Sequence, residues 1–255
     1  MLKSLFQYRE FLKSNVKKEI RGKYKGSFLG VLWSFLNPLL AVLVYAIIFP
    51  FIMKNSIDNY LVYLITGFIP WTFFTLSIQM GMVSILANAN IIKKVYFPRI
   101  ILPISSVTSA LVNFCISLVI VLLFVIGSGI GVSLYLIYLP IIILIQYIML
   151  LGITFILSSV DIYARDIENI VNFVIQMLFY GTPILYSKEI FPESIYFLLN
   201  LNPMTHIIDA YRAVLFYQTT PDFLSLGLTF FFSIILLFVG YFIFDKLQRG
   251  FAEEV

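Results

Sequence analysis

Residues 100–126 have the sequence IILPISSVTSALVNFCISLVIVLLFVI, a run of 27 residues without Asp, Glu, Lys, Arg or His. An uncharged apolar stretch of about 18 or more residues is long enough to cross the hydrocarbon core of a bilayer as a helix. Backbone groups in that core must bond within the segment, which favours a helix. This stretch therefore predicts a transmembrane helix.

Five further runs of the same kind flank it, at residues 28–53, 60–86, 134–160, 169–186 and 223–244. All 17 basic and 13 acidic residues lie outside the six runs. The chain is 61% hydrophobic and 12% charged, against about 45–50% and about 25% in soluble domains. This composition excludes a soluble globular domain and a disordered chain. We predict one all-α integral membrane domain, residues 1–255, with six transmembrane helices.

The basic residues are distributed unequally between the two sides of the predicted membrane domain. Fourteen of the 17 Lys and Arg lie in residues 1–27, in the second and fourth loops and in the C-terminal tail; Lys54, Lys188 and Arg212 lie opposite. Cytoplasmic loops carry an excess of Lys and Arg. This asymmetry predicts a multi-pass membrane protein with both termini in the cytoplasm.

Two segments outside the runs have helical patterns. Residues 1–27 place basic side chains between apolar ones, which is typical of an amphipathic helix lying at the cytoplasmic interface against anionic lipid. Residues 187–221 predict two short outer helices: one begins near Pro192 and ends near Asn202, and Thr205 caps the second. Neither is long enough to span, so we expect a re-entrant pair buried in protein.

Two loops on the predicted cytoplasmic side also have sequences that predict local structure. Residues 87–99, ANANIIKKVYFPR, have the size of a short helix across the membrane plane that Pro98 stops. Residues 161–168, DIYARDIE, place Asp161 and Arg165 four residues apart, which predicts an ion pair on one helical face. A solvated, salt-bridged turn is favoured there over a paired-carboxylate site for hydrolysis.

Several kinds of chemistry are missing from the sequence. It contains no GxxxxGK[ST] phosphate-binding loop, and no ionisable group in the six runs to relay protons or bind a coupling ion. Cys115 is the only cysteine and His206 the only histidine, so no metal site is predicted. We expect no catalytic, cofactor-binding or metal-binding residue. The chain therefore has the features of a transport conduit without an energy source of its own. Such a conduit needs a soluble motor protein as a partner.

The polar residues inside the runs are neutral. One helical face of the third run carries Ser106, Ser109, Asn113 and Ser117. Interhelical hydrogen bonding is the favoured interpretation of these residues; the alternative is that they form the wall of a path for a polar cargo. Asn172, Gln176 and Tyr180 share one face of the fifth run, where packing and a path wall have equal support. Aromatic residues, 17% of the chain, are typical of interfacial belts, and some would suit a glycan path.

Four passages resemble the membrane subunit of ABC exporters for cell-surface polysaccharides, the group that handles O-antigen, teichoic acid and capsule. These are YKGSFLGVLWSFLNPLL at 24–40, NIIKKVYFPRIILP at 90–103, DIYARDIENIV at 161–171, and TPILYS at 182–187 followed by LNPMTHIIDAYR at 201–212. Their order and spacing cover nearly the whole chain. The resemblance implies that the protein lies in a bacterial or archaeal plasma membrane.

The resemblance implies a half-transporter: two copies pair, two ATP-binding subunits that hold ATP and Mg²⁺ dock beneath them, and a lipid-linked glycan is moved, with no nucleic-acid partner. It also assigns residues to sites. The ATPase-coupling loop contains Asn90, Lys93, Lys94, Tyr96, Phe97 and Pro98; the cytoplasmic turn contains Asp161, Arg165, Asp166 and Glu168. The candidate path wall contains Trp33, Tyr45, Asn172, Gln176 and Tyr180; the outer gate, about residues 192–217, contains Pro192, Pro203, His206 and Arg212. Replacing Phe97 or Lys93 is expected to uncouple export.

Two alternatives differ in the cargo or in the reaction. An ABC exporter of a drug or small lipid has the same frame and differs only in its substrate. A membrane-embedded transferase is the remote alternative, because His206 and Asp209 lie three residues apart on one helical face, in the positions of a base and its orienting group. The polar face of an interfacial helix is the favoured interpretation of that pair.

Overall fold

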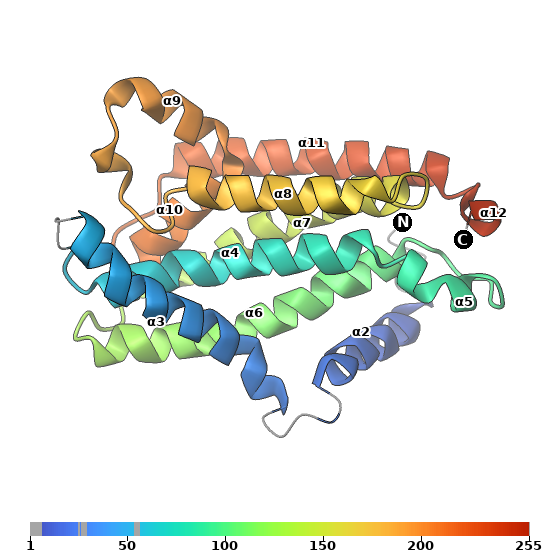
Figure 1. Ribbon diagram of the computed structural model, residues 1–255, viewed down its shortest axis with the longest axis horizontal. Helices are drawn as coiled ribbons and strands as arrows, with labels where there is room; N and C mark the ends of the chain where they lie inside the picture. Colours follow the sequence, from blue (N-terminus) through green and yellow to red (C-terminus); the bar gives the residue numbers. More distant parts are fainter. Residues whose placement is uncertain (1–6, 25, 27–29, 54–56, 255) are drawn as a thin grey trace.

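The computed structural model describes residues 7–24, 26, 30–53 and 57–254. Residues 1–6 of the predicted interface segment, residues 28 and 29 of the first predicted run, and Lys54 lie outside the described residues. The described part of the chain is helical, contains no β-strand, and most of its long helices lie side by side (Figure 1). The helices are α2 (Arg9–Tyr24), α3 (Trp33–Met53), α4 (Tyr60–Met82), α5 (Ala89–Ile92), α6 (Ile101–Gly127), α7 (Leu139–Val160), α8 (Asp166–Gly181), α9 (Glu193–Leu201), α10 (Pro203–Leu215), α11 (Phe223–Leu247) and α12 (Phe251–Glu254).

Four helical segments are long and apolar enough to cross a membrane: Tyr60–Met82, Ile101–Gly127, Leu134–Val160 and Phe223–Leu247. They correspond to four of the six predicted runs. The other two runs contain α3, an uncharged helix of 21 residues, and α8 with 16 residues. Helix α8 is shorter than the roughly 20 residues that a spanning helix needs. The helix in the run 169–186 ends at Gly181 because Pro183 disfavours the helical conformation at Thr182, which is extended.

Helix α4 occupies the middle of the bundle (Figure 1) and packs against α3, α6, α7, α8 and α10. Large side chains such as Trp71 and Phe73 are almost completely buried on it. An all-round apolar helix is expected in such a central position. Through these contacts α4 becomes the common wall against which the other elements are arranged.

Helices α7 and α11 approach most closely at two glycines. A Cβ on Gly240 would lie 2.4 Å from the backbone oxygen of Gly152, and a Cβ on Gly152 would lie 2.7 Å from the backbone carbon of Leu236. Small residues allow helix backbones to approach closely, which is a main source of packing energy in membranes. The α7–α11 pair is therefore a tight unit.

The amphipathic helix α2 docks on the first turns of α6. The Asn15 amide donates to the Ser105 hydroxyl, and the Ser106 hydroxyl donates to Glu19 Oε1 over 2.8 Å. Interhelical hydrogen bonding was the favoured interpretation of Ser106, and the bond to Glu19 joins two helices. Lys18 also donates to Asn88 Oδ1, at 3.2 Å, so α2 is joined to the loop before α5.

The two short helices predicted between residues 187 and 221 are present as α9 and α10. The cap of α10 is Asn202, whose side chain accepts from the Met204 N–H over 3.0 Å; the predicted cap, Thr205, is buried inside the helix. The reason is Pro203, which suits the first helical position and makes the residue before it the cap. Most of α10 is buried, whereas α9 exposes Phe197 and Leu201.

Candidate transport cavity and its surroundings

A cavity of about 860 Å³ lies between α3, α4, α6 and α8. This volume is within the range of about 300–1,000 Å³ that is typical of ligand sites. All five residues predicted for a path wall line it: Trp33, Tyr45, Asn172, Gln176 and Tyr180. The structure therefore brings together, at one cavity, side chains that are up to 147 positions apart in the sequence.

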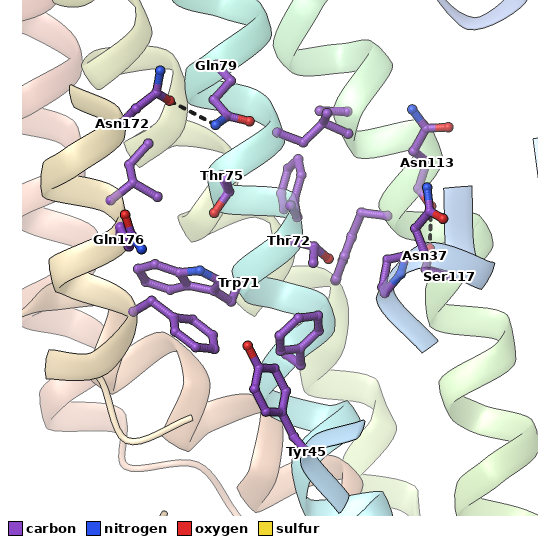
Figure 2. A pocket seen from close by; sticks show the side chains of 18 of the residues that line it. Asn37, Tyr45, Trp71, Thr72, Thr75, Gln79, Asn113, Ser117, Asn172 and Gln176 are labelled. Carbon is purple, nitrogen blue, oxygen red and sulfur yellow. Dashed lines mark hydrogen bonds between the residues drawn. The ribbon is translucent and has the colours of Figure 1, made fainter. Parts of the chain in front are cut away.

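Neutral polar groups reach the cavity from all four helices (Figure 2). Helix α8 contributes Asn172 and Gln176, and Gln79 of α4 donates to Asn172 Oδ1 over 2.9 Å. The remaining polar side chains are Asn37 of α3, Thr72 and Thr75 of α4, and Asn113 and Ser117 of α6. These amides and hydroxyls both donate and accept hydrogen bonds, as the hydroxyls of a sugar do.

Aromatic rings surround the part of the cavity farthest from Gln79 and Asn172. The Phe179 centroid lies 5.9 Å from that of Phe68, 5.8 Å from that of Trp71 and 6.1 Å from that of Tyr45. In Figure 2 Tyr45 and the Gln79–Asn172 pair lie at opposite ends of the site. The cavity thus has an amide-rich end and an aromatic end, and no charged residue is among the described residues that line it.

The contribution of α4 to the cavity was not predicted from the sequence. Thr72, Thr75 and Gln79 are spaced by three and four residues, so they share one helical face, and this signal was available in the sequence. It was obscured because α4 is apolar all round and its neighbours determine which face meets the cavity. The residues of the polar face predicted on the third run have two different surroundings. Ser106 contacts α2, whereas Asn113 and Ser117 line the cavity.

The short helix of the predicted coupling loop is α5, which covers Ala89–Ile92 and ends before Pro98. Residues 93–98 continue the loop without helix. Tyr96 is 97% exposed, whereas Phe97 is only 6% exposed and its ring lies 4.8 Å from that of Phe11 of α2. Phe97 therefore attaches the loop to the protein, and Tyr96 is the side chain that projects from it.

The coupling loop also contacts the C-terminal segment. Lys93, Lys94, Tyr96, Phe97, Pro98 and Arg99 line a hollow of about 640 Å³ together with Gln248 and Arg249. Arg99 donates to the Gln248 carbonyl oxygen, and its guanidinium lies 5.9 Å from the centre of the Phe251 ring. Phe251 is fully buried. The C-terminus thus supports one side of this loop.

The predicted ion pair between Asp161 and Arg165 does not form in the part of the chain that the structure describes. Helix α7 ends at Val160 and α8 begins at Asp166, so the four-residue spacing does not place the two side chains on one helical face. Asp161 is buried with one carboxylate oxygen unpartnered. Burial raises its pKa, Glu168 adds to this effect, and Arg165 opposes it.

Asp166 and Glu168 of the same turn lie in the first turn of α8. Negative charge is favourable at a helix N-terminus, where the backbone N–H groups are unpaired. Tyr163 donates to the Leu247 carbonyl oxygen over 3.0 Å. The turn between α7 and α8, predicted to be cytoplasmic, is therefore stabilised by the helix dipole and by the end of α11.

Two of the residues predicted for an outer gate, His206 and Arg212, line a hollow of about 370 Å³ together with Asp209 and Lys188, among others. Pro192 precedes α9, and Pro203 is the first residue of α10. His206 Nε2 lies 2.8 Å from the Asn200 carbonyl oxygen, and Asp209 forms an ion pair with Lys188 at 3.1 Å. His206 and Asp209, the hypothetical general base and its orienting group, thus each have another partner. The structure does not bring them together as a catalytic pair.

Long apolar helices around an uncharged polar cavity are typical of the membrane component of a transporter. The sequence comparisons agree with this class. Residues 10–216 match the model of the ABC-2 type transporter membrane family, and the chain belongs to that family.

Curated relatives of the chain are named exporters. It is 38% identical to O-antigen export system permease protein RfbA of Klebsiella pneumoniae, over 92% of this chain and 91% of that protein. It is 35% identical to the protein of the same name from Myxococcus xanthus, over 100% and 99% of the two chains. Polysialic acid transport protein KpsM of Escherichia coli is 23% identical over 88% of each chain.

Proposed function

We propose that this chain is the permease subunit of an ATP-driven exporter that moves a lipid-linked polysaccharide out of the cytoplasm. The observation that carries the proposal is the cavity between α3, α4, α6 and α8, which presents amides, hydroxyls and aromatic rings without charge. Those groups suit a hydroxyl-rich, uncharged polymer. Relatives named as O-antigen permeases support the same cargo class.

The proposal includes six membrane crossings and a second copy of the chain. Helix α8 runs roughly parallel to the longer helices and α3 crosses them at an angle (Figure 1), and both expose apolar side chains, among them Ile47, Ile48, Phe173 and Met177. Both helices also border the cavity. A second copy placed there would complete the wall and make one path between the two subunits.

The energy comes from ATP, with Mg²⁺, bound by a separate subunit at the cytoplasmic face, where both termini also lie. Tyr96 is the proposed contact with that subunit, because it is the most exposed large hydrophobic residue of the coupling loop, and tyrosine is enriched among residues that dominate interfaces. When ATP closes the motor subunits, the loop moves with them. The α3 and α8 helices of the two copies then separate, and the glycan passes outward.

The cargo is tested by deleting the gene and extracting lipid-linked glycans from both sides of the membrane. We expect finished polymer to accumulate on the cytoplasmic side and to disappear from the surface. Complementation with Gln176→Leu, which replaces a cavity amide by an apolar group of similar size, should restore the protein level but less than a tenth of the export. Normal surface glycan in the deletion strain, in the absence of a second exporter, would contradict the proposal.

The docking site is tested by purifying the complex through a tag on the ATP-binding subunit. Tyr96→Ala should remove most of this chain from the purified complex, because hot-spot residues contribute roughly 2 kcal/mol or more to an interface. Leu134→Ala is the control, since Leu134 is 94% exposed but belongs to the proposed outer side. Equal recovery of the two variants would rule out Tyr96 as the contact.

A further inference from the structure

The six residues that follow α8, Thr182 to Ser187, are not helical and are called the strap below. Helix α8 has 16 residues and is about 24 Å long, shorter than the roughly 30 Å of a bilayer core. In a six-span protein the strap therefore lies at membrane depth. Non-helical backbone is tolerated there only where its polar groups find partners within the protein.

The strap finds these partners through its carbonyl groups, and four successive ones each accept a hydrogen bond from a side chain. Arg212 donates through Nη1 to Pro183 and through Nη2 to Ile184, the latter over 2.7 Å. The next two carbonyl oxygens, of Leu185 and Tyr186, accept from the hydroxyls of Tyr60 at 2.6 Å and Tyr63 at 2.9 Å.

The site is built around Arg212 of α10. Its guanidinium carbon lies 3.6 Å from the centre of the Tyr63 ring, and the residue is only 2% exposed. Gly67 of α4 leaves room for it, because a Cβ there would lie 2.8 Å from Nη2. Among the described residues no carboxylate pairs with Arg212, so carbonyl oxygens and an aromatic face hold its charge.

Two further contacts join the strap to the outer helices. The Asn202 amide donates to the Thr182 hydroxyl over 2.8 Å, and Lys188, directly after the strap, pairs with Asp209 of α10. Helix α10 is in turn anchored to the bundle: Tyr211 donates to Gln146 of α7, and Gln146 donates to the Pro70 carbonyl of α4. The end of α8 is therefore linked to α10 and α4 at several points.

We propose that Arg212, Tyr60 and Tyr63 are positioning residues that latch the strap, so that the outer end of α8 moves only together with α10. This inference rests on the proposed export function, because α8 borders the proposed path. The three side chains do not contact the cargo: Arg212 is buried and its two Nη groups are already used by the strap. Release of the latch opens the aromatic end of the cavity to the outside.

The test uses the complete complex in membranes, with Cys115→Ser and Ile184→Cys as the common background. Ile184 lies on the strap and is fully buried, so its cysteine reacts with a membrane-impermeant thiol reagent only when the strap opens. Tyr63→Phe keeps the ring but removes one donor, and Arg212→Gln removes two. We expect labelling from outside, without ATP, to become about tenfold faster in Tyr63→Phe, which corresponds to about 1.4 kcal/mol, and faster still in Arg212→Gln.

Tyr211→Phe is the matched control, because it also loses one buried hydroxyl donor, but this hydroxyl bonds to Gln146 and not to the strap. Its thermal stability should fall as much as that of Tyr63→Phe while its labelling stays slow. Export per ATP hydrolysed should fall in Tyr63→Phe but not in Tyr211→Phe. Unchanged labelling in Tyr63→Phe and in Tyr60→Phe, or equal acceleration in Tyr211→Phe, would overturn the latch. Labelling does not depend on cargo, so the latch can be judged even if the glycan proposal fails.

Discussion

Helices α3, α7 and α11 are similarly apolar and α8 is less so, yet the α7–α11 pair and the α3–α8 pair pack in opposite ways. The first pair meets backbone to backbone at Gly152 and Gly240. The second pair borders a cavity, and α8 has little contact with the bundle beyond α4. Apolar character alone therefore does not decide how tightly a membrane helix packs. Small residues make one pair close, and bulky aromatic and amide side chains leave the other open.

This difference separates a rigid region, the α7–α11 pair, from a region that can move, the α3–α8 pair. A tight glycine contact has no room for a second arrangement, because dense packing is not continuously deformable. The α3–α8 side has few such constraints, and its firmest attachments are the Gln79–Asn172 hydrogen bond and the latch at the strap. Motion of α8 against a fixed α7–α11 unit is what this arrangement permits.

The largest effect is expected from filling the tight contact. Gly240→Ala places a methyl group against the Gly152 backbone, which cannot turn aside, so we expect a loss of about 3 kcal/mol or more, toward the upper end of overpacking costs, and little folded protein. Gly227→Ala on the same helix is the control, because no atom lies within 4 Å of its Cβ; it should keep or raise stability by helix propensity. Comparable loss in both variants, measured by thermal unfolding in detergent, would contradict the distinction between the two regions.

The sequence alone predicted the helices that depend on charge exclusion, because a bilayer penalises every charge in its core. It could not predict that α8 would stop at Gly181 and continue as a strap, although Pro183 was a local sign. It placed Arg212 in the gate but not on the carbonyls of Pro183 and Ile184, 29 and 28 positions away. Such contacts depend on helix rotation and docking, which have no signature in a single sequence.

A smaller but still clear effect is expected from cysteines on the exposed face of α8. If the exposed face of α8 meets a second copy, cysteines at Ile170, Phe173, Val174 and Met177 in a Cys115→Ser background should include at least one that forms a disulfide-linked dimer on oxidation. A disulfide needs Cα atoms within about 7 Å, so the four positions sample two turns. Phe231 and Phe238 of α11 are equally exposed controls and should stay monomeric. Dimers through α11 alone would place the second copy on the other side.

The smallest effect concerns the docking of α2, where Glu19 accepts from Ser106 but leaves Oε2 buried without a partner. Burial raises the pKa of Glu19 above the ordinary 4.5. The docked state therefore binds the proton more tightly than the free state, so docking is strongest at low pH and weakens as pH rises above about 4.5 and through the raised pKa.

Glu19→Gln removes the buried charge and should tighten docking at neutral pH by about 1 kcal/mol or less. A spin label at exposed Lys17 should become less mobile in Glu19→Gln near pH 8, and the two proteins should converge as the pH falls below the raised pKa of Glu19. Glu10→Gln, at an exposed ion pair with Lys13, is the control and should leave the label unchanged; greater mobility in Glu19→Gln at neutral pH would mean that the charged form of Glu19 holds α2 in place.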